Sequence, residues 1–164
     1  MRILHTSDWH LGQHFFGKSR LAEHQAFIDW LVQTVEQQQI DVVLVAGDIF
    51  DTGTPPSYAR ELYNQCIVKL QVLQVQLVVL GGNHDSVATL GESSQILRCL
   101  NTHVVAMASE EVCEQVIVLN RRRRAEADFD APIPGAVLCA IPFLRPRDLL
   151  TSQSGQSGAD KQQQ

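Results

Sequence analysis

Two stretches decide the fold, DVVLVAGD (residues 41–48) and QLVVLGGNHD (residues 76–85). Each runs through consecutive branched apolar residues and ends in a polar cluster, and RILHTSD (residues 2–8) repeats this pattern near the start of the chain. Unbroken apolar runs of this length are typical of strands that are covered on both faces, as in a sheet between helices. The three runs therefore predict three buried strands of one sheet.

Two segments with helical periodicity join these strands. Residues 20–39 and residues 55–74 each repeat apolar side chains at helical spacing, and two prolines restrain the entry to the second segment. The predicted stripes are Leu21, Ile28, Leu31, Val32 and Val35, and then Ala59, Leu62, Cys66, Leu70 and Leu73. Because strand, helix and strand repeat, we predict parallel strands and an α/β fold class.

The rest of the chain predicts a more hairpin-like half. We expect a helix around residues 91–101, strands at 103–107, 114–120 and 135–143, and an exposed connection at 121–135. Residues 151–164 contain almost no apolar side chain and predict a polar linker or loop. With 164 residues and 45% hydrophobic content, the chain can bury one ordinary core, so residues 1–150 are predicted to form one domain or part of one.

Composition excludes several classes of function. The formal net charge of −5 gives no overall positive field, so a nucleic acid would have to be held locally. The four cysteines (Cys66, Cys99, Cys113 and Cys139) lack zinc-type spacing, and we expect reduced, mostly buried thiols. Because no apolar run suits a signal peptide or a membrane span, we expect a cytoplasmic chain with no membrane partner.

Metal-ligand residue types follow all three predicted strands. SDWH supplies Asp8 and His10, AGD supplies Asp48, and GGNHD supplies an asparagine, a histidine and an aspartate. The carboxyl ends of parallel strands share one edge of a sheet, so the three clusters are expected to converge. Asp8 and His10 are two residues apart, so in extended chain both side chains face the same side and one ion can take both.

The remaining positions suit a pair of ions. The carboxylate of Asp48 can bridge two ions, and Asn83 offers a neutral carbonyl oxygen to the second. Three glycines (Gly47, Gly81 and Gly82) allow sharp strand exits and a close approach of backbone to the ions. His84 would stand beside the site as a non-ligand that protonates a leaving oxygen or stabilises the charged phosphorus centre.

The motifs SDWHLG (residues 7–12), AGDIFDTG (46–53) and GGNHD (81–85) resemble the first three motifs of the calcineurin-like metallophosphoesterases. The resemblance continues to at least residue 150. It implies a layered core with parallel or mixed sheets flanked by helices, and two divalent ions, Mn²⁺ first and Mg²⁺ as the alternative.

The family pattern implies a role for each matching residue. Asp8 and His10 would hold one ion, Asp48 would bridge, Asn83 would bind the second ion, and His84 would be the catalytic histidine. Asp85 would orient that histidine. Related nucleases outside bacteria often carry a histidine where this chain has Asp51, so the resemblance leaves proton handling at this position open.

Within the superfamily, the wording around the motifs is similar to the nuclease subunits of DNA double-strand-break repair complexes. This similarity implies hydrolysis of DNA phosphodiesters with the 3′ oxygen as the leaving group, a homodimer, and an ATPase partner subunit that binds the ATP. Two alternatives remain open, a metallophosphoesterase acting on nucleotides or phosphoproteins and a non-catalytic module for dimerisation or docking. Tyr63 and Ile67, beside the main stripe of their helix, suit either such an interface or the core.

The family pattern continues with a G-H motif and a G-H-x-H motif that supply three further histidine ligands, and this chain has neither. The other histidines (His5, His14, His24 and His103) match neither motif and are expected to be structural or exposed. We therefore expect the N-terminal part of a longer nuclease, with an incomplete metal shell, weak metal binding and little activity by itself.

GQHFFGKS (residues 12–19) fits the phosphate-loop pattern G-x-x-x-x-G-K-[ST]. A phosphate loop needs small residues at its variable positions, whereas two of the four are phenylalanines here. We therefore predict no ATP bound by this chain and a loop in which Lys18 and Arg20 either contact substrate phosphates or are solvated. The run Arg121–Arg124 leaves the same two interpretations open, a phosphate contact or a solvated hairpin tip.

Overall fold

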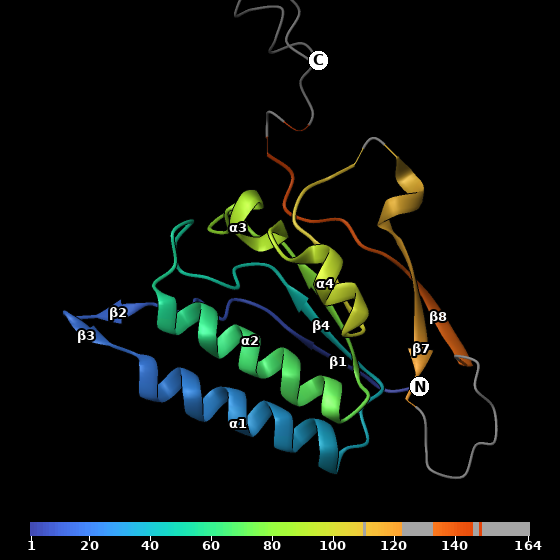
Figure 1. Ribbon diagram of the computed structural model, residues 1–164, viewed down its shortest axis with the longest axis horizontal. Coiled ribbons are helices and arrows are strands. Elements are labelled where there is room, and N and C mark those ends of the chain that lie inside the picture. The colour runs from blue at the N-terminus through green and yellow to red at the C-terminus, as the bar shows by residue number, and fades with distance from the viewer. Residues whose placement is uncertain (110, 123–132, 146–147, 149–164) are drawn as a thin grey trace, which may run out of the picture.

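A four-stranded parallel sheet forms the centre of the molecule (Figure 1). The computed structural model describes residues 1–109, 111–122, 133–145 and 148. The strands lie in the order β1 (Ile3–Thr6), β4 (Val42–Ala46), β5 (Gln76–Leu80) and β6 (Thr102–Val105), and all adjacent pairs are parallel. The α/β class and the parallel arrangement predicted from the sequence are confirmed.

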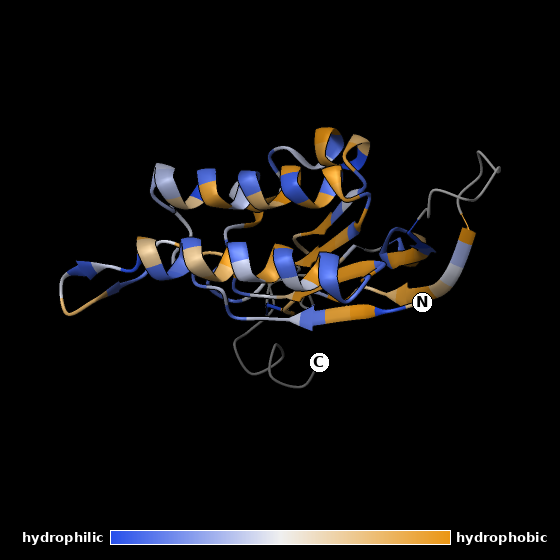
Figure 2. Ribbon diagram, turned by 90° about the horizontal axis from the view of Figure 1, so that it is seen from below, coloured by the Kyte–Doolittle hydropathy of each residue, from blue (hydrophilic) through white to orange (hydrophobic). Residues whose placement is uncertain are grey.

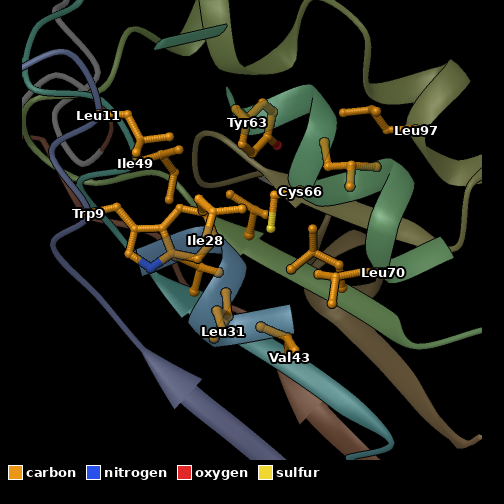
Figure 3. Packing of buried hydrophobic residues seen from close by; sticks show 14 of the residues in the cluster. Trp9, Leu11, Ile28, Leu31, Val43, Ile49, Tyr63, Cys66, Leu70 and Leu97 are labelled. Carbon is orange, nitrogen blue, oxygen red and sulfur yellow. The ribbon is translucent and has the colours of Figure 1, made fainter. Parts of the chain in front are cut away.

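Helices α1 (Leu21–Gln37) and α2 (Ser57–Val72) lie side by side over one face of this sheet (Figure 1). Their apolar stripes pack with alternate residues of β4 and β5 in one buried cluster, part of which Figure 3 shows. In Figure 2 polar and apolar residues alternate around both helices, whereas the central strands are mostly apolar. The predicted stripes are largely confirmed, although Leu21 is exposed and Val32 is half-buried at the flank of α1.

An antiparallel pair of strands covers the opposite face. β7 (Val116–Arg121) follows the short helix η1 (Val112–Gln115) and pairs with β8 (Ile133–Cys139). Neighbouring residues of a strand point to opposite faces, so Val43 joins the helices while Val42 packs with the hairpin. The hairpin-like half is therefore a separate two-stranded sheet, not an extension of the parallel one.

Two short helices, α3 (Val87–Gly91) and α4 (Ser94–Cys99), connect β5 to β6. The helix expected around residues 91–101 corresponds to α4, whereas α3 was not predicted. Ser86 caps α3 by accepting a hydrogen bond from the backbone N–H of Thr89 at 3.3 Å.

Three expectations about burial are wrong. β1 is the edge strand of the sheet and is only partly covered, so Ile3 is 47% exposed. Of the four cysteines only Cys66 is buried, although all four are free thiols. Tyr63 and Ile67 lie in the core, so they cannot form a docking surface.

Residues 12–19 form a β-hairpin that projects from the body of the molecule (Figure 1). β2 (His14–Phe15) and β3 (Lys18–Ser19) pair antiparallel around Phe16 and Gly17, whose φ angles are 47° and 76°. Two successive positive φ angles are the signature of a type I′ hairpin turn. A hairpin at this point excludes the phosphate loop, as predicted.

Some predicted segments lie outside the described residues. These are the linker at 151–164 and most of the connection at 121–135, including Arg123 and Arg124. Arg122, which is described, donates its backbone N–H to Asp41 Oδ1 at 2.9 Å. No described helix is both long and apolar enough to cross a membrane.

Candidate metal centre

The loops that follow β1 and β4 are joined by backbone hydrogen bonds. The N–H of Asp8 donates to the carbonyl of Gly47 at 3.1 Å, and the N–H of His10 donates to that of Asp48 at 3.0 Å. One residue further, Leu11 donates to Ile49 at 2.9 Å. The parallel pairing of the strands thus continues into the loops and brings the first two motifs into contact.

Three candidate ligands have left-handed backbone. The φ angles are 55° at Asp8, 44° at His10 and 49° at Asp48. Such values are uncommon for residues other than glycine, and strained positions of this kind cluster at functional sites. The prediction that Asp8 and His10 lie in extended chain is therefore wrong, because turned backbone brings their side chains together instead.

The side chains of these residues converge on one point. His10 Nε2 lies 3.9 Å from Asp8 Oδ1 and 4.0 Å from Asp48 Oδ2. Candidate ligand atoms of all three residues lie within 4.8 Å of one another. Two carboxylate oxygens and an imidazole nitrogen suit a divalent ion such as Mn²⁺ or Mg²⁺, so this donor set fits the implied metal.

The third motif approaches through its glycines. A Cβ atom on Gly82 would overlap Asp48 Oδ1 and the Asp48 backbone nitrogen, and Gly47 has a φ of 90°. The His84 backbone N–H donates to Asp48 Oδ1 at 3.0 Å, which leaves Oδ2 facing His10. Asn83 is exposed and lines the same pocket as Asp8 and Asp48.

Asp85 fixes the loops to each other. Its buried carboxylate accepts backbone hydrogen bonds from Ile49 at 3.2 Å, Phe50 at 3.0 Å and Gly82 at 2.8 Å. We expected Asp85 to orient the imidazole of His84, but these three bonds hold backbone instead. Asp85 therefore positions the second and third motifs as a unit.

The His84 imidazole is anchored by backbone. Its Nδ1 lies 2.9 Å from the carbonyl oxygen of Asp51, and its ring meets the His10 ring edge-on, with the ring centres 5.0 Å apart. The hydrogen bond to that carbonyl raises the pKa of His84, and the negative charges of Asp48, Asp51 and Asp85 add to this effect. When Nδ1–H donates to the carbonyl, Nε2 is the nitrogen that can give or take a proton.

The comparisons with known proteins agree with this geometry. The family model described as calcineurin-like phosphoesterase matches residues 1–126. The chain belongs to the calcineurin-like phosphoesterase family. The resemblance and fold class predicted from the motifs are thereby confirmed.

Relatives of this phosphoesterase chain share one description, the SbcD subunit of the nuclease SbcCD. The one from Escherichia coli K12 is 60% identical over 163 residues, covering 99% of this chain and 38% of the relative. The one from Rhodobacter capsulatus is 38% identical over 165 residues, covering 97% of this chain and 40% of the relative. The one from Bacillus subtilis is 38% identical over 112 residues, or 68% of this chain and 29% of the relative. The chain thus spans well under half the length of these relatives.

Sequence reasoning missed Arg145. Its Nη2 donates to the carbonyls of Gly82 at 3.0 Å and Asp85 at 2.9 Å, and the N–H of Phe143 donates to Gly81 at 2.9 Å. The segment at 141–145 therefore lies against the third phosphoesterase motif and closes one side of the pocket. An arginine after the last apolar run carries no pattern that distinguishes it from other surface arginines.

The two predicted phosphate contacts have different surroundings. Lys18 is exposed on β3, in the hairpin next to the first motif. Arg20 is half-buried, and its Nη1 donates to Gln13 Oε1 at 2.6 Å.

The remaining histidines stand apart from the candidate ligand groups among the described residues. His5 and His14 are exposed, whereas His103 is half-buried and His24 is buried. Burial is the main cause that lowers the pKa of both His24 and His103, which favours neutral side chains. These positions match the expectation of structural or exposed histidines.

Proposed function

We propose that this chain is the N-terminal part, residues 1–150, of the nuclease domain of an SbcCD-type enzyme, followed by a polar linker at 151–164. The enzyme hydrolyses DNA phosphodiester bonds, as a double-strand exonuclease and a single-strand endonuclease, in DNA repair, recombination and replication. The observation that carries the proposal is the convergence of Asp8, His10 and Asp48 at the ends of two parallel strands. The name shared by the relatives supports DNA as the substrate.

Each site residue has a proposed part in the reaction. Asp8 and His10 hold one divalent ion, Asp48 bridges, and Asn83 holds the second ion, with Mn²⁺ as the physiological metal. When bound, the two ions lower the pKa of water and neutralise charge that develops on the phosphate.

The protein side chains handle orientation and protons. The Asp51 carbonyl fixes His84 Nδ1, so Nε2 is the nitrogen that donates a proton to the leaving 3′ oxygen. The raised pKa of His84 increases the fraction that carries this proton near neutral pH. Lys18 and Arg20 contact phosphates of the DNA backbone, which positions the strand without reading its sequence.

The proposed partners are DNA, an SbcC-type ATPase subunit and a second copy of this chain, all in the cytoplasm. Tyr63 and Ile67 are buried in the core, so they do not supply the dimer or docking surface. The relatives are roughly two and a half times as long as this chain, because 163 residues cover 38% of the Escherichia coli protein. We therefore place further histidine ligands in the part of the relatives that this chain does not span.

A comparison of substrates tests the proposal. Mn²⁺-dependent hydrolysis is measured on duplex DNA, single-stranded DNA, a nucleoside monophosphate and a phosphopeptide, with the chain and with its His84→Gln variant. We expect slow hydrolysis of DNA above that of the monoesters, and its loss in the variant. Faster hydrolysis of the nucleotide or the phosphopeptide would instead support the second phosphoesterase alternative.

A further inference from the structure

Asp51 contacts both histidines of the site, through two different groups. Its side-chain Oδ1 lies 3.3 Å from His10 Nδ1, and its backbone carbonyl oxygen lies 2.9 Å from His84 Nδ1. Candidate ligand atoms of Asp51, His10 and His84 lie within 4.8 Å of one another. The described residues therefore contain a second acidic and histidine cluster, which shares His10 with the first.

The side chain of Asp51 is held from outside the site. Gln13 Nε2 donates to Asp51 Oδ1 at 3.2 Å, and Gln13 Oε1 accepts from Arg20 Nη1 at 2.6 Å. A guanidinium has only donors, so the oxygen of the Gln13 amide must face Arg20 and its NH₂ group must face Asp51. The polarity of the chain of hydrogen bonds is thus set by Arg20.

The opposite side of the His10 ring faces the metal ligands. His10 Nε2 is the nitrogen near Asp8 Oδ1 and Asp48 Oδ2, whereas Nδ1 is buried and has no aligned hydrogen bond within the described part of the chain. Asp51 Oδ1, at 3.3 Å, is the carboxylate oxygen placed to take a proton from Nδ1 after a small rotation. A metal-ligating histidine usually donates its other N–H to a carboxylate, carbonyl or water, which fixes its tautomer.

We propose that Asp51, held by Gln13 and Arg20, is a positioning residue that keeps the proton of His10 on Nδ1 and leaves the Nε2 lone pair free to bind a divalent ion. The link to the ion rests on the function proposed above, whereas the tautomer is a property of the chain itself. The carbonyl of Asp51 anchors the second histidine independently, because the Asp51 N–H is held by the Leu11 carbonyl at 3.2 Å. A change of the Asp51 side chain is therefore expected to affect His10 and spare His84.

Nitrogen-15 NMR of the histidine rings at pH 8.5, with metal removed, tests the tautomer directly. We expect Nδ1–H for His10 in the unaltered chain and a shift towards Nε2–H in Asp51→Ala, with a smaller shift in Gln13→Ala. The His84 ring signals should stay unchanged in both variants. Asp29→Ala, which removes the same charge from the exposed surface of α1, serves as the control and should leave the His10 tautomer as it was.

Mn²⁺ titration of these variants by calorimetry gives a second readout. Loss of an outer carboxylate costs about 10-fold to 100-fold in metal affinity, so Asp51→Ala should weaken binding by that factor and Asp29→Ala should not. An Nε2–H tautomer in the unaltered chain, or an unchanged tautomer in Asp51→Ala, overturns the role of Asp51. Absence of any Mn²⁺ binding by the unaltered chain would instead overturn the proposed metal centre, and the NMR result would still decide the tautomer.

Discussion

Replacing Asp85 tests whether the buried carboxylate holds the second and third motifs together. Its Oδ2 accepts from Ile49 and Gly82, and its Oδ1 accepts from Phe50. Asp85→Ala removes the acceptor from three backbone N–H groups at once. Asp85→Asn keeps an oxygen at the Oδ2 position, but it turns an NH₂ group towards the N–H of Phe50.

The magnitude follows from these bonds. A hydrogen bond to a charged group contributes about 1.5–3 kcal/mol to stability. Removing the carboxylate also removes its own desolvation cost and lets water reach the donors, so we expect Asp85→Ala to lower the free energy of unfolding by about 3–5 kcal/mol. Asp85→Asn loses one bond and gains a contact between two donors, which predicts a loss of about 1.5–3 kcal/mol.

Urea denaturation followed by circular dichroism measures these changes. Asp29→Asn is the matched control, because Asp29 is an exposed carboxylate that pairs with Lys69 at 2.6 Å, and its replacement should leave stability nearly unchanged. A loss below about 1 kcal/mol in Asp85→Ala would refute this account of the carboxylate. Equal losses in the alanine and asparagine variants would also refute it, since the asparagine retains two of the three bonds.

Other substitutions test separate parts of the structure. Gly82→Ala should cost about 1–3 kcal/mol in urea denaturation and weaken Mn²⁺ binding, because its Cβ would overlap Asp48, whereas Gly53→Ala, whose nearest contact is 3.5 Å, should do neither. Phe16→Asn should be more stable than Phe16→Ala by about 0.5–1 kcal/mol, because both lose the ring but asparagine better tolerates the φ of 47°. Equal stabilities would contradict the type I′ turn. In folded protein at pH 8, a thiol reagent should label Cys99, Cys113 and Cys139 but not Cys66, since burial raises the pKa of that thiol to about 12. Rapid labelling of a fourth thiol without unfolding would contradict the core packing.

Periodicity predicted the centre of the fold because its strands are buried in an ordinary way. Val42 to Ala46 and Gln76 to Leu80 are apolar runs with helices on one face and a hairpin on the other. The same pattern misled for β1, because a strand at the edge of a sheet is as rich in branched residues as a central one. The exposed cysteines were missed because their burial depends on the helix face and hairpin side that the sequence does not specify.

The residue types of the candidate site were predictable, but its local geometry was not. Asp8, His10 and Asp48 follow strands whose ends share one edge, so their convergence follows from topology. Their left-handed backbone does not, since φ angles depend on the hydrogen bonds between loops. The contacts of Asp51 and Arg145 depend on loops that meet from distant parts of the chain, and no local pattern marks them.

The most direct test of the metal centre is a calorimetric titration of Mn²⁺ into this chain and into Asp48→Ala. The carboxylate of Asp48 faces His10 through one oxygen and the third motif through the other, so every proposed ligand depends on its position. We predict weak binding to the unaltered chain and its loss in the variant. Binding that survives the substitution, or no binding at all, would contradict a metal centre built from the three strand-end motifs, and two tight sites would contradict the incomplete shell.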